Sequence, residues 1–136
     1  SRDGIDWEAL ARIYARAPLA VRPAVEIKRA FGNSYLCCFA WVNDKLVGAA
    51  RATSDGVYYA TIVDVAVDPG FQCAGIGRKM MTELLRRLKV QKVYLTNVPG
   101  KEGFYEKLGF LPQTNAMGLF PVHAREEALE LGLLVA

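Results

Sequence analysis

The sequence predicts a single mixed α/β domain over residues 1–136, in which helices flank a central, mostly antiparallel, twisted sheet. Three observations predict it. Apolar residues recur at helical spacing over the first 32 residues, three strand-like runs joined by short turns follow up to residue 67, and helical and extended segments alternate from there to residue 120. A chain of 136 residues that is 52% hydrophobic and 23% charged can bury one core.

The first two elements are predicted to be helices. Asp6 can cap a helix over residues 7–16, whose apolar face carries Leu10, Ile13 and Tyr14 and which Pro18 would end. A second helix is expected from Pro23, a residue suited to the first helical position, to a stop at Gly32.

An antiparallel meander is predicted next. Residues 35–42 and 46–53 read as the two arms of a hairpin joined by a turn at 43–45. A second turn at 54–56 leads into a strand over 58–67, which is so apolar toward its end that we expect it to be central in the sheet.

The second half alternates between helix and extended chain. A helix is predicted over 77–90, a short strand over 92–96, a short helix over 102–108 closed by Gly109, and an extended pair over 110–120. Residues 122–136 are expected to form an amphipathic or dangling tail.

Composition excludes several classes of function. The net charge of +3 is small and dispersed, so no nucleic-acid partner is expected, and no apolar run approaches the ~20 residues that span a bilayer. With one histidine and three cysteines that lack metal or redox spacing, no metal site is predicted. No secretory signal is recognisable, so we expect a cytoplasmic protein with no membrane partner.

The segment after the central strand is predicted to bind an anion. A tight stop at Asp68-Pro69-Gly70 and a glycine-containing turn, Gln72–Gly77, lead into a helix whose first backbone amides have no intrahelical partner. Arg78 and Lys79 in the first turn oppose the helix dipole unless an anion lies there. The alternative is two solvated basic residues.

Two other phosphate motifs do not fit this segment. Gly70 and Gly75 have P-loop spacing, but Ile76 and Gly77 stand where a lysine and a hydroxyl residue are required. A dinucleotide fingerprint starting at Gly75 would need a glycine where Met80 stands, and an antiparallel meander precedes the turn in place of a βαβ unit.

Two motifs resemble the GNAT N-acetyltransferase superfamily. Its signature Gln/Arg-x-x-Gly-x-Gly/Ala is present as Gln72-Cys73-Ala74-Gly75-Ile76-Gly77, and its aromatic-Tyr-x-x-Leu-Gly-Phe segment as residues 104–110. The stretch 60–69 is also similar to small bacterial members and to the plant and cyanobacterial arylalkylamine (serotonin-type) acetyltransferases. In that family a strand usually precedes the first helix, and we expect that strand to be truncated from this sequence.

The resemblance implies acetyl-CoA as cosubstrate, with no metal. It places the pyrophosphate on the Gln72–Gly77 turn and Arg78, and the acyl carbonyl and pantetheine on the backbone of Val65, Ala66 and Val67, where the central strand splays from its neighbour. The family asparagine that bonds pantetheine is displaced by one position here, to Asn97.

The resemblance also implies two catalytic residues. Tyr105 corresponds to the general acid that protonates the departing thiolate, with a tyrosine capping the core as the alternative. Asp64, an acid within an apolar strand, would accept the amine proton through water. The alternative for Asp64 is an acid bonded to backbone or to a nearby arginine. A covalent role for Cys73 is disfavoured, because direct transfer needs no carrier.

The expected activity is acetyl transfer from acetyl-CoA to a primary amine by direct attack in a ternary complex. Candidates for the acceptor wall are Trp41, Tyr58, Tyr59 and residues 117–120, although core packing explains these side chains equally well. A small aryl or alkyl amine is the leading acceptor, and a protein lysine or N-terminus, or a non-catalytic acyl-CoA-binding module, is the alternative. Whether two copies of the chain form a homodimer stays open.

Overall fold

The computed structural model describes residues 2–17 and 20–136, so the predicted helix stop at Pro18 lies outside the described residues. Its contacts divide the chain into two compact units, Ser1–Pro99 and Gly100–Ala136, which are described separately. The family motifs fall in both, the Gln72–Gly77 turn in the first and Tyr105 in the second. That the chain forms one domain stays a prediction.

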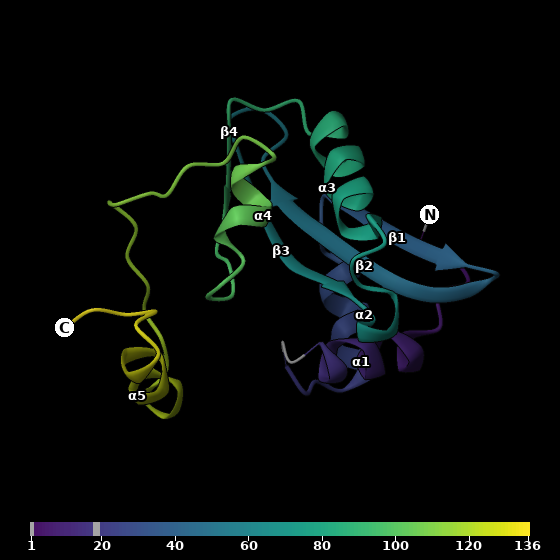
Figure 1. Ribbon diagram of the computed structural model, residues 1–136, viewed down its shortest axis with the longest axis horizontal. Helices are drawn as coiled ribbons and strands as arrows, with labels where there is room; N and C mark the ends of the chain where they lie inside the picture. Colours follow the sequence, from purple (N-terminus) through teal and green to yellow (C-terminus); the bar gives the residue numbers. More distant parts are fainter. Residues whose placement is uncertain (1, 18–19) are drawn as a thin grey trace. The chain divides into compact units, whose positions relative to one another are not determined.

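The first unit is built on a four-stranded sheet in the order β1-β2-β3-β4 (Figure 1). Strands β1 (Leu36–Val42), β2 (Lys45–Ser54) and β3 (Tyr59–Val67) are antiparallel, and β4 (Lys92–Leu95) runs parallel to β3. Asn43 and Asp44 take positive φ angles in the hairpin turn, a conformation that both side chains tolerate. The predicted mixed, mostly antiparallel sheet with a central third strand is confirmed.

Three helices cover the two faces of this sheet (Figure 1). Helices α1 (Trp7–Arg16) and α2 (Ala24–Gly32) lie on one face, and α3 (Ile76–Arg87) lies on the other. The Asp6 carboxylate caps α1 by accepting a hydrogen bond from the Ala9 amide at 3.0 Å, as predicted. Pro23 precedes α2 as its N-cap, one position earlier than predicted, and α2 ends at Gly32.

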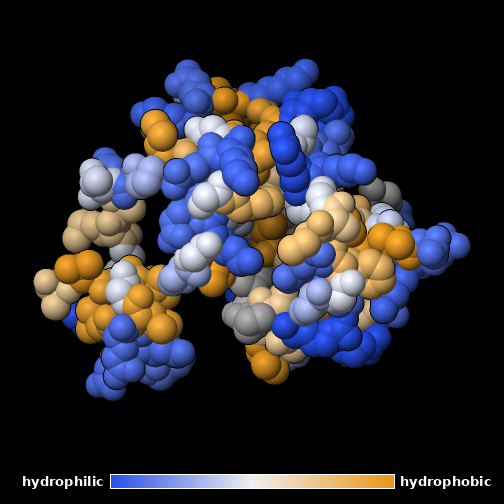
Figure 2. Space-filling view, viewed as in Figure 1, coloured by the Kyte–Doolittle hydropathy of each residue, from blue (hydrophilic) through white to orange (hydrophobic). Residues whose placement is uncertain are grey.

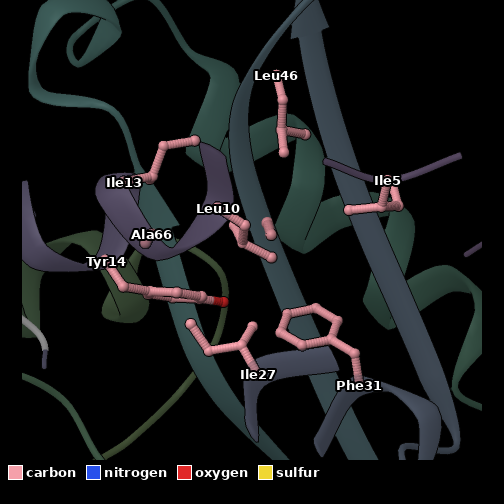
Figure 3. Close-up of a cluster of buried hydrophobic side chains, with 9 residues drawn as sticks. Ile5, Leu10, Ile13, Tyr14, Ile27, Phe31, Leu46 and Ala66 are labelled. Atoms are coloured by element: carbon pink, nitrogen blue, oxygen red, sulfur yellow. The ribbon is translucent and has the colours of Figure 1, made fainter. Parts of the chain in front are cut away.

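The core between α1, α2 and the sheet fixes the orientation of the site. Leu10, Ile13 and Tyr14 from α1 meet Ile27 and Phe31 from α2 in one buried cluster (Figure 3). The Tyr14 ring extends from its helix with the hydroxyl directed at the sheet (Figure 3). On the opposite face Gly48 lets α3 approach, because an added Cβ would lie 3.2 Å from the Met80 sulfur.

The second unit contains two helices, α4 (Glu102–Glu106) and α5 (Val122–Glu130). The predicted extended pair over 110–120 is wrong, because no strand forms there and every residue of 111–120 is exposed. An extended segment needs a strand partner for its backbone, and the sequence of the segment alone does not supply one. In the expected tail, apolar side chains gather around α5 (Figure 2), among them Leu131 and Leu133.

Candidate active site

A bulge interrupts β3 at the predicted catalytic aspartate. Val63 pairs with Arg51 and Ala66 with Ala49, so β3 has two residues, Asp64 and Val65, where β2 has one. Asp64 accordingly adopts a φ of 57°, the left-handed conformation that aspartate tolerates better than most residues. Bulges redirect side chains and recur beside active sites, but nothing in the sequence signalled this one.

Beyond the bulge, β3 has lost its neighbour on one side. The pairing with β4 ends at Ile62 and Leu95, whereas β3 continues to Val67. Among the described residues no strand pairs with this edge of Val65, Ala66 and Val67. The splay that the family resemblance implied is therefore present, and it leaves backbone groups available to a ligand that lies along the strand.

The chain then turns tightly into α3. Asp68 accepts a hydrogen bond from the Gly70 amide at 3.0 Å and forms an ion pair with Arg16. The Gln72 side chain does not point outward but returns to the strand, where its Nε2 donates to the Val67 carbonyl at 3.0 Å. Cys73 has a φ of 67°, and residues Gln72–Gly75 are all exposed. The turn thus stands open beside the end of β3.

The N-terminus of α3 has the features of an anion site. Gly75 is its N-cap with a φ of 78°, no side chain caps the helix, and its first turn contains no acid. The amides of Ile76, Gly77 and Arg78 precede the first helical hydrogen bond, from Lys79 to the Gly75 carbonyl at 3.1 Å. Within the described part of the chain, Arg78 and Lys79 have no ion-pair partner. An anion at these amides would complement both side chains.

Asn97 lies two residues beyond β4. Its Nδ2 donates to the carbonyl of the adjacent Val98 at 3.1 Å, and the residue is partly exposed. Within the described part of the chain the amide oxygen accepts no hydrogen bond, while the nitrogen stabilises its own loop. The role of Asn97 in holding pantetheine stays a prediction.

The Asp64 carboxylate is held by two arginines from different elements. Its Oδ1 lies 2.9 Å from Arg22 Nη1 and its Oδ2 lies 2.7 Å from Arg51 Nε, and the side chain is 12% exposed. Its backbone carbonyl accepts a hydrogen bond of 2.7 Å from the Tyr14 hydroxyl. Arginine partners were the alternative foreseen for this acid. Its role as a base stays a prediction.

These side chains line a cavity of about 220 Å³ on the α1–α2 face of the sheet. Four of its residues carry polar or charged groups that the sequence analysis did not connect with the site: Tyr14, Arg22, Glu26 and Arg51. They come from separate segments of the chain, and no sequence motif joins them. The remaining lining residues are Ile27, Ala30, Phe31 and Asp64.

Tyr105 lies in α4 of the second unit. Its ring centroid is 4.9 Å from that of Phe104 and 6.0 Å from that of Phe110, and its carbonyl accepts a hydrogen bond from the Phe110 amide at 3.1 Å. Burial raises the pKa of Tyr105 above its ordinary value. The phenol is accordingly protonated at neutral pH, which is the state that a proton donor needs.

The aromatic candidates for the acceptor wall do not line the Asp64 cavity. Trp41, Tyr58 and Tyr59 are each about half exposed, and Trp41 borders a second cavity of about 420 Å³ near Arg12 and Lys45. Met117 is fully exposed. Over the described ranges, no cluster of histidine, cysteine and acidic side chains is suited to a metal ion. The same residues include no helix long and apolar enough to cross a bilayer.

Comparisons with known proteins agree with this architecture. The chain matches the model of the acetyltransferase (GNAT) family over residues 6–110. A probable acetyltransferase of Staphylococcus aureus, 20% identical, has the same fold with a TM-score of 0.79 over 89% of this chain and 96% of its own. The ribosomal-protein-S18-alanine N-acetyltransferase of Escherichia coli, 26% identical, has a TM-score of 0.71 over 82% of this chain and 76% of its own.

Curated relatives are similar over most of the chain. An uncharacterized N-acetyltransferase of Prochlorococcus marinus is 40% identical over 78% of this chain and 63% of its own length. The rice protein named serotonin N-acetyltransferase 2, chloroplastic, is 33% identical over 86% of this chain and 62% of its own. The chain thus spans about three fifths of the length of these relatives. Because plant relatives are named chloroplastic, a cytoplasmic location stays a prediction.

The family match covers both motifs on which the resemblance was based, the Gln72–Gly77 turn and the segment around Tyr105. It also covers the β3 bulge and all the residues that hold Asp64. The chain belongs to the acetyltransferase (GNAT) family.

Proposed function

We propose that this chain transfers an acetyl group from acetyl-CoA to a primary amine, by direct attack of the amine on the thioester in a ternary complex. The observation that supports it most is the unpaired edge of β3 leading into the uncapped N-terminus of α3. A thioester with a long polar arm and a pyrophosphate needs both features in this order, because the arm can pair with strand backbone and the pyrophosphate with helix amides.

The cosubstrate would be held mainly by backbone. The amides at Gly75–Arg78 and the Arg78 side chain would take the pyrophosphate, and the β3 edge at Val65–Val67 would take the pantetheine and the acyl carbonyl. A fixed backbone donor needs no reorganisation when negative charge develops on that carbonyl oxygen, an effect worth roughly 3 kcal/mol in well-studied oxyanion sites. Asn97, Gln72, Cys73 and Ala74 would complete the wall of this groove.

The reaction would use three proton transfers. The ammonium form of the acceptor first loses a proton, which Asp64 would accept directly or through water. The neutral amine then attacks the thioester carbon, the carbon–sulfur bond breaks, and the thiolate takes a proton from the Tyr105 phenol. As the amide forms, its nitrogen loses a second proton, which returns through water to the Tyr105 phenolate, and Asp64 releases its proton to solvent.

A small aryl or alkyl amine is the acceptor best supported. The cavity beside Asp64 has apolar walls of Ile27 and Phe31, and the rice relative is named a serotonin N-acetyltransferase. The name of the E. coli neighbour favours a second candidate, the N-terminal amine of a protein. The two differ in what surrounds the amine, so a panel of small amines and short peptides separates them.

A thiol-release assay across that panel tests the proposal, with calorimetry of coenzyme A binding beside it. We expect turnover with at least one amine, and we expect Tyr105→Phe to reduce kcat by at least ten-fold while acetyl-CoA affinity is retained. Tyr35→Phe is the matched control, since Tyr35 is a half-exposed tyrosine outside both motifs and outside the candidate acceptor wall. Tight coenzyme A binding without turnover on any amine would instead identify a non-catalytic acyl-CoA-binding module.

A further inference from the structure

The two arginines that hold Asp64 are not equivalent. Arg51 is 18% exposed, and besides its ion pair its Nη1 donates to Ser34 Oγ at 3.3 Å. Its guanidinium carbon also lies 5.9 Å from the centre of the Phe31 ring. Arg51 is thus fixed by β2 and by three separate contacts, which makes it a permanent partner of the carboxylate.

Arg22 is held by the ion pair alone. It precedes α2, its side chain is 43% exposed, and its single polar contact among the described residues joins Nη1 to Asp64 Oδ1. An ion pair with one hydrogen bond and a partly solvated arginine is easily exchanged, because the long side chain loses little on returning to water. Asp64 Oδ1 therefore has an exchangeable cation.

The charges of the cavity lining indicate what kind of group would replace Arg22. The cavity lining carries two arginines and two acids, Asp64 and Glu26, and is therefore neutral as it stands. When Arg22 leaves, Arg51 faces both acids and the lining has a net charge of −1. The Glu26 carboxylate has no ion-pair partner among the residues that the structure describes. The vacated position thus suits one positive charge.

The walls of the cavity indicate what that cation is attached to. Ile27 and Phe31 are almost fully buried and, with Ala30, give the lining an apolar side supplied by α2. A ligand with a compact cationic head and an apolar body matches both parts of the lining, whereas a second, negative group would face Asp64 and Glu26 at close range.

We propose that Arg22 occupies the position of the acceptor ammonium on Asp64 Oδ1 in the free protein, and that the acceptor displaces it. The acceptor class is then a primary monoamine with an apolar body and no acidic group beside the amine. The acceptor assignment rests on the proposed acetyl transfer; the exchangeable cation position on Asp64 does not.

The test compares two probes that differ by one carboxylate, 2-phenylethylamine and phenylalanine, in the absence of acetyl-CoA. Titration calorimetry would measure both on the wild type, on Arg22→Gln, and on Arg29→Gln as the control. Arg29 is an exposed arginine on α2 that does not line the cavity. We expect Arg22→Gln to bind 2-phenylethylamine about five-fold more tightly, the factor equivalent to removing a competing ion pair of about 1 kcal/mol.

Three results would overturn the proposal: unchanged or weaker binding of 2-phenylethylamine by Arg22→Gln, tighter binding of phenylalanine than of 2-phenylethylamine by the wild type, or no binding of 2-phenylethylamine by either protein. The second result would make Arg22 a carboxylate-binding residue. Matching thermal unfolding curves for the two variants would show that both are folded.

Guanidinium ion separates this proposal from the proposed function. At low millimolar concentration it should shift the backbone amide resonance of residue 64 more strongly in Arg22→Gln than in the wild type, where Arg22 competes for the position, and should leave that resonance unshifted in the double variant Arg22→Gln/Asp64→Asn. If guanidinium and 2-phenylethylamine bind in this way while no amine is acetylated, the cation position stands and the transfer function fails. If amines are acetylated and Arg22→Gln changes no affinity, the cation position is wrong.

Discussion

Replacing Tyr14 with phenylalanine removes one hydroxyl from the site and little else. Tyr14 is 1% exposed in the α1–α2 core, and its hydroxyl donates to the Asp64 carbonyl at 2.7 Å. That carbonyl belongs to the β3 bulge, where Asp64 has a φ of 57°. Tyr14→Phe therefore leaves the packing of the ring intact and takes away the one side-chain hydrogen bond that, among the described residues, reaches the bulge backbone from the helical layer.

The magnitude follows from the burial of the hydrogen bond. Leaving a buried acceptor without its donor costs about 1–3 kcal/mol. For a chain of this size, a loss of 1 kcal/mol lowers the melting temperature by roughly 4 °C. We therefore expect Tyr14→Phe to melt roughly 4–12 °C below the wild type, with an unchanged urea m-value because the same surface is exposed on unfolding.

The assay is urea and thermal unfolding of Tyr14→Phe beside Tyr58→Phe, in which the lost hydroxyl belongs to a half-exposed ring. Burial also raises the pKa of Tyr14 above its ordinary value of 10.0, so its contribution is complete below pH 10 and is lost as the pH rises further. Wild type should consequently lose more stability than Tyr14→Phe between pH 9 and pH 11. A change below 0.5 kcal/mol at pH 7 would refute this account of the hydrogen bond.

Three further predictions concern residues 68–75, between the end of β3 and the start of α3. The Gly70 amide lowers the pKa of Asp68 below its usual 3.8, so the ionised Asp68 stabilises the fold above about pH 4 and stops doing so as the pH falls. Asp68→Asn should therefore flatten the acid side of a curve of unfolding free energy against pH, and an unchanged curve would contradict this. Gly75→Ala should lower the free energy of unfolding by roughly 1 kcal/mol, because Gly75 has a φ of 78°, and should weaken acetyl-CoA binding. Gly132→Ala is the control: at a φ of 74° it should lower the free energy of urea unfolding by the same amount and leave acetyl-CoA binding intact. Cys73→Ala should keep kcat within about two-fold if transfer is direct, and an acetyl adduct on Cys73 detected by mass spectrometry would argue for a covalent carrier instead.

Local signals in the sequence were sufficient to predict most of the helices, strands and turns of the first unit. The Asp6 cap, the apolar face of α1 and the turn at 43–45 are all decided within a few residues, and the structure confirms each of them. The prediction of a pair of strands over 110–120 failed because strand pairing is not decided within a few residues. The local sequence describes a segment that could be extended, but whether a partner strand is present depends on distant parts of the chain.

The residues around Asp64 could not be predicted from the sequence either. The bulge arises from the register between β2 and β3, and both arginines come from elements that only packing brings to the carboxylate. The sequence showed an isolated acid in an apolar strand and left its partners open, because neither Arg22 nor Arg51 stands at a spacing from Asp64 that carries information.

By itself the sequence determined the order of elements as far as α4, the mixed sheet, and the family to which the two motifs point. Those properties depend on periodicity and on backbone-dictated turns such as Gln72–Gly77, which neighbouring residues impose on one another. The tertiary structure decided that β3 bulges and loses its neighbour, and that Asp64 carries one fixed and one exchangeable arginine. Electrostatic partners are set by distance in space, and a charge that is 42 positions away along the chain, as Arg22 is, becomes a contact only when the sheet and α2 have packed.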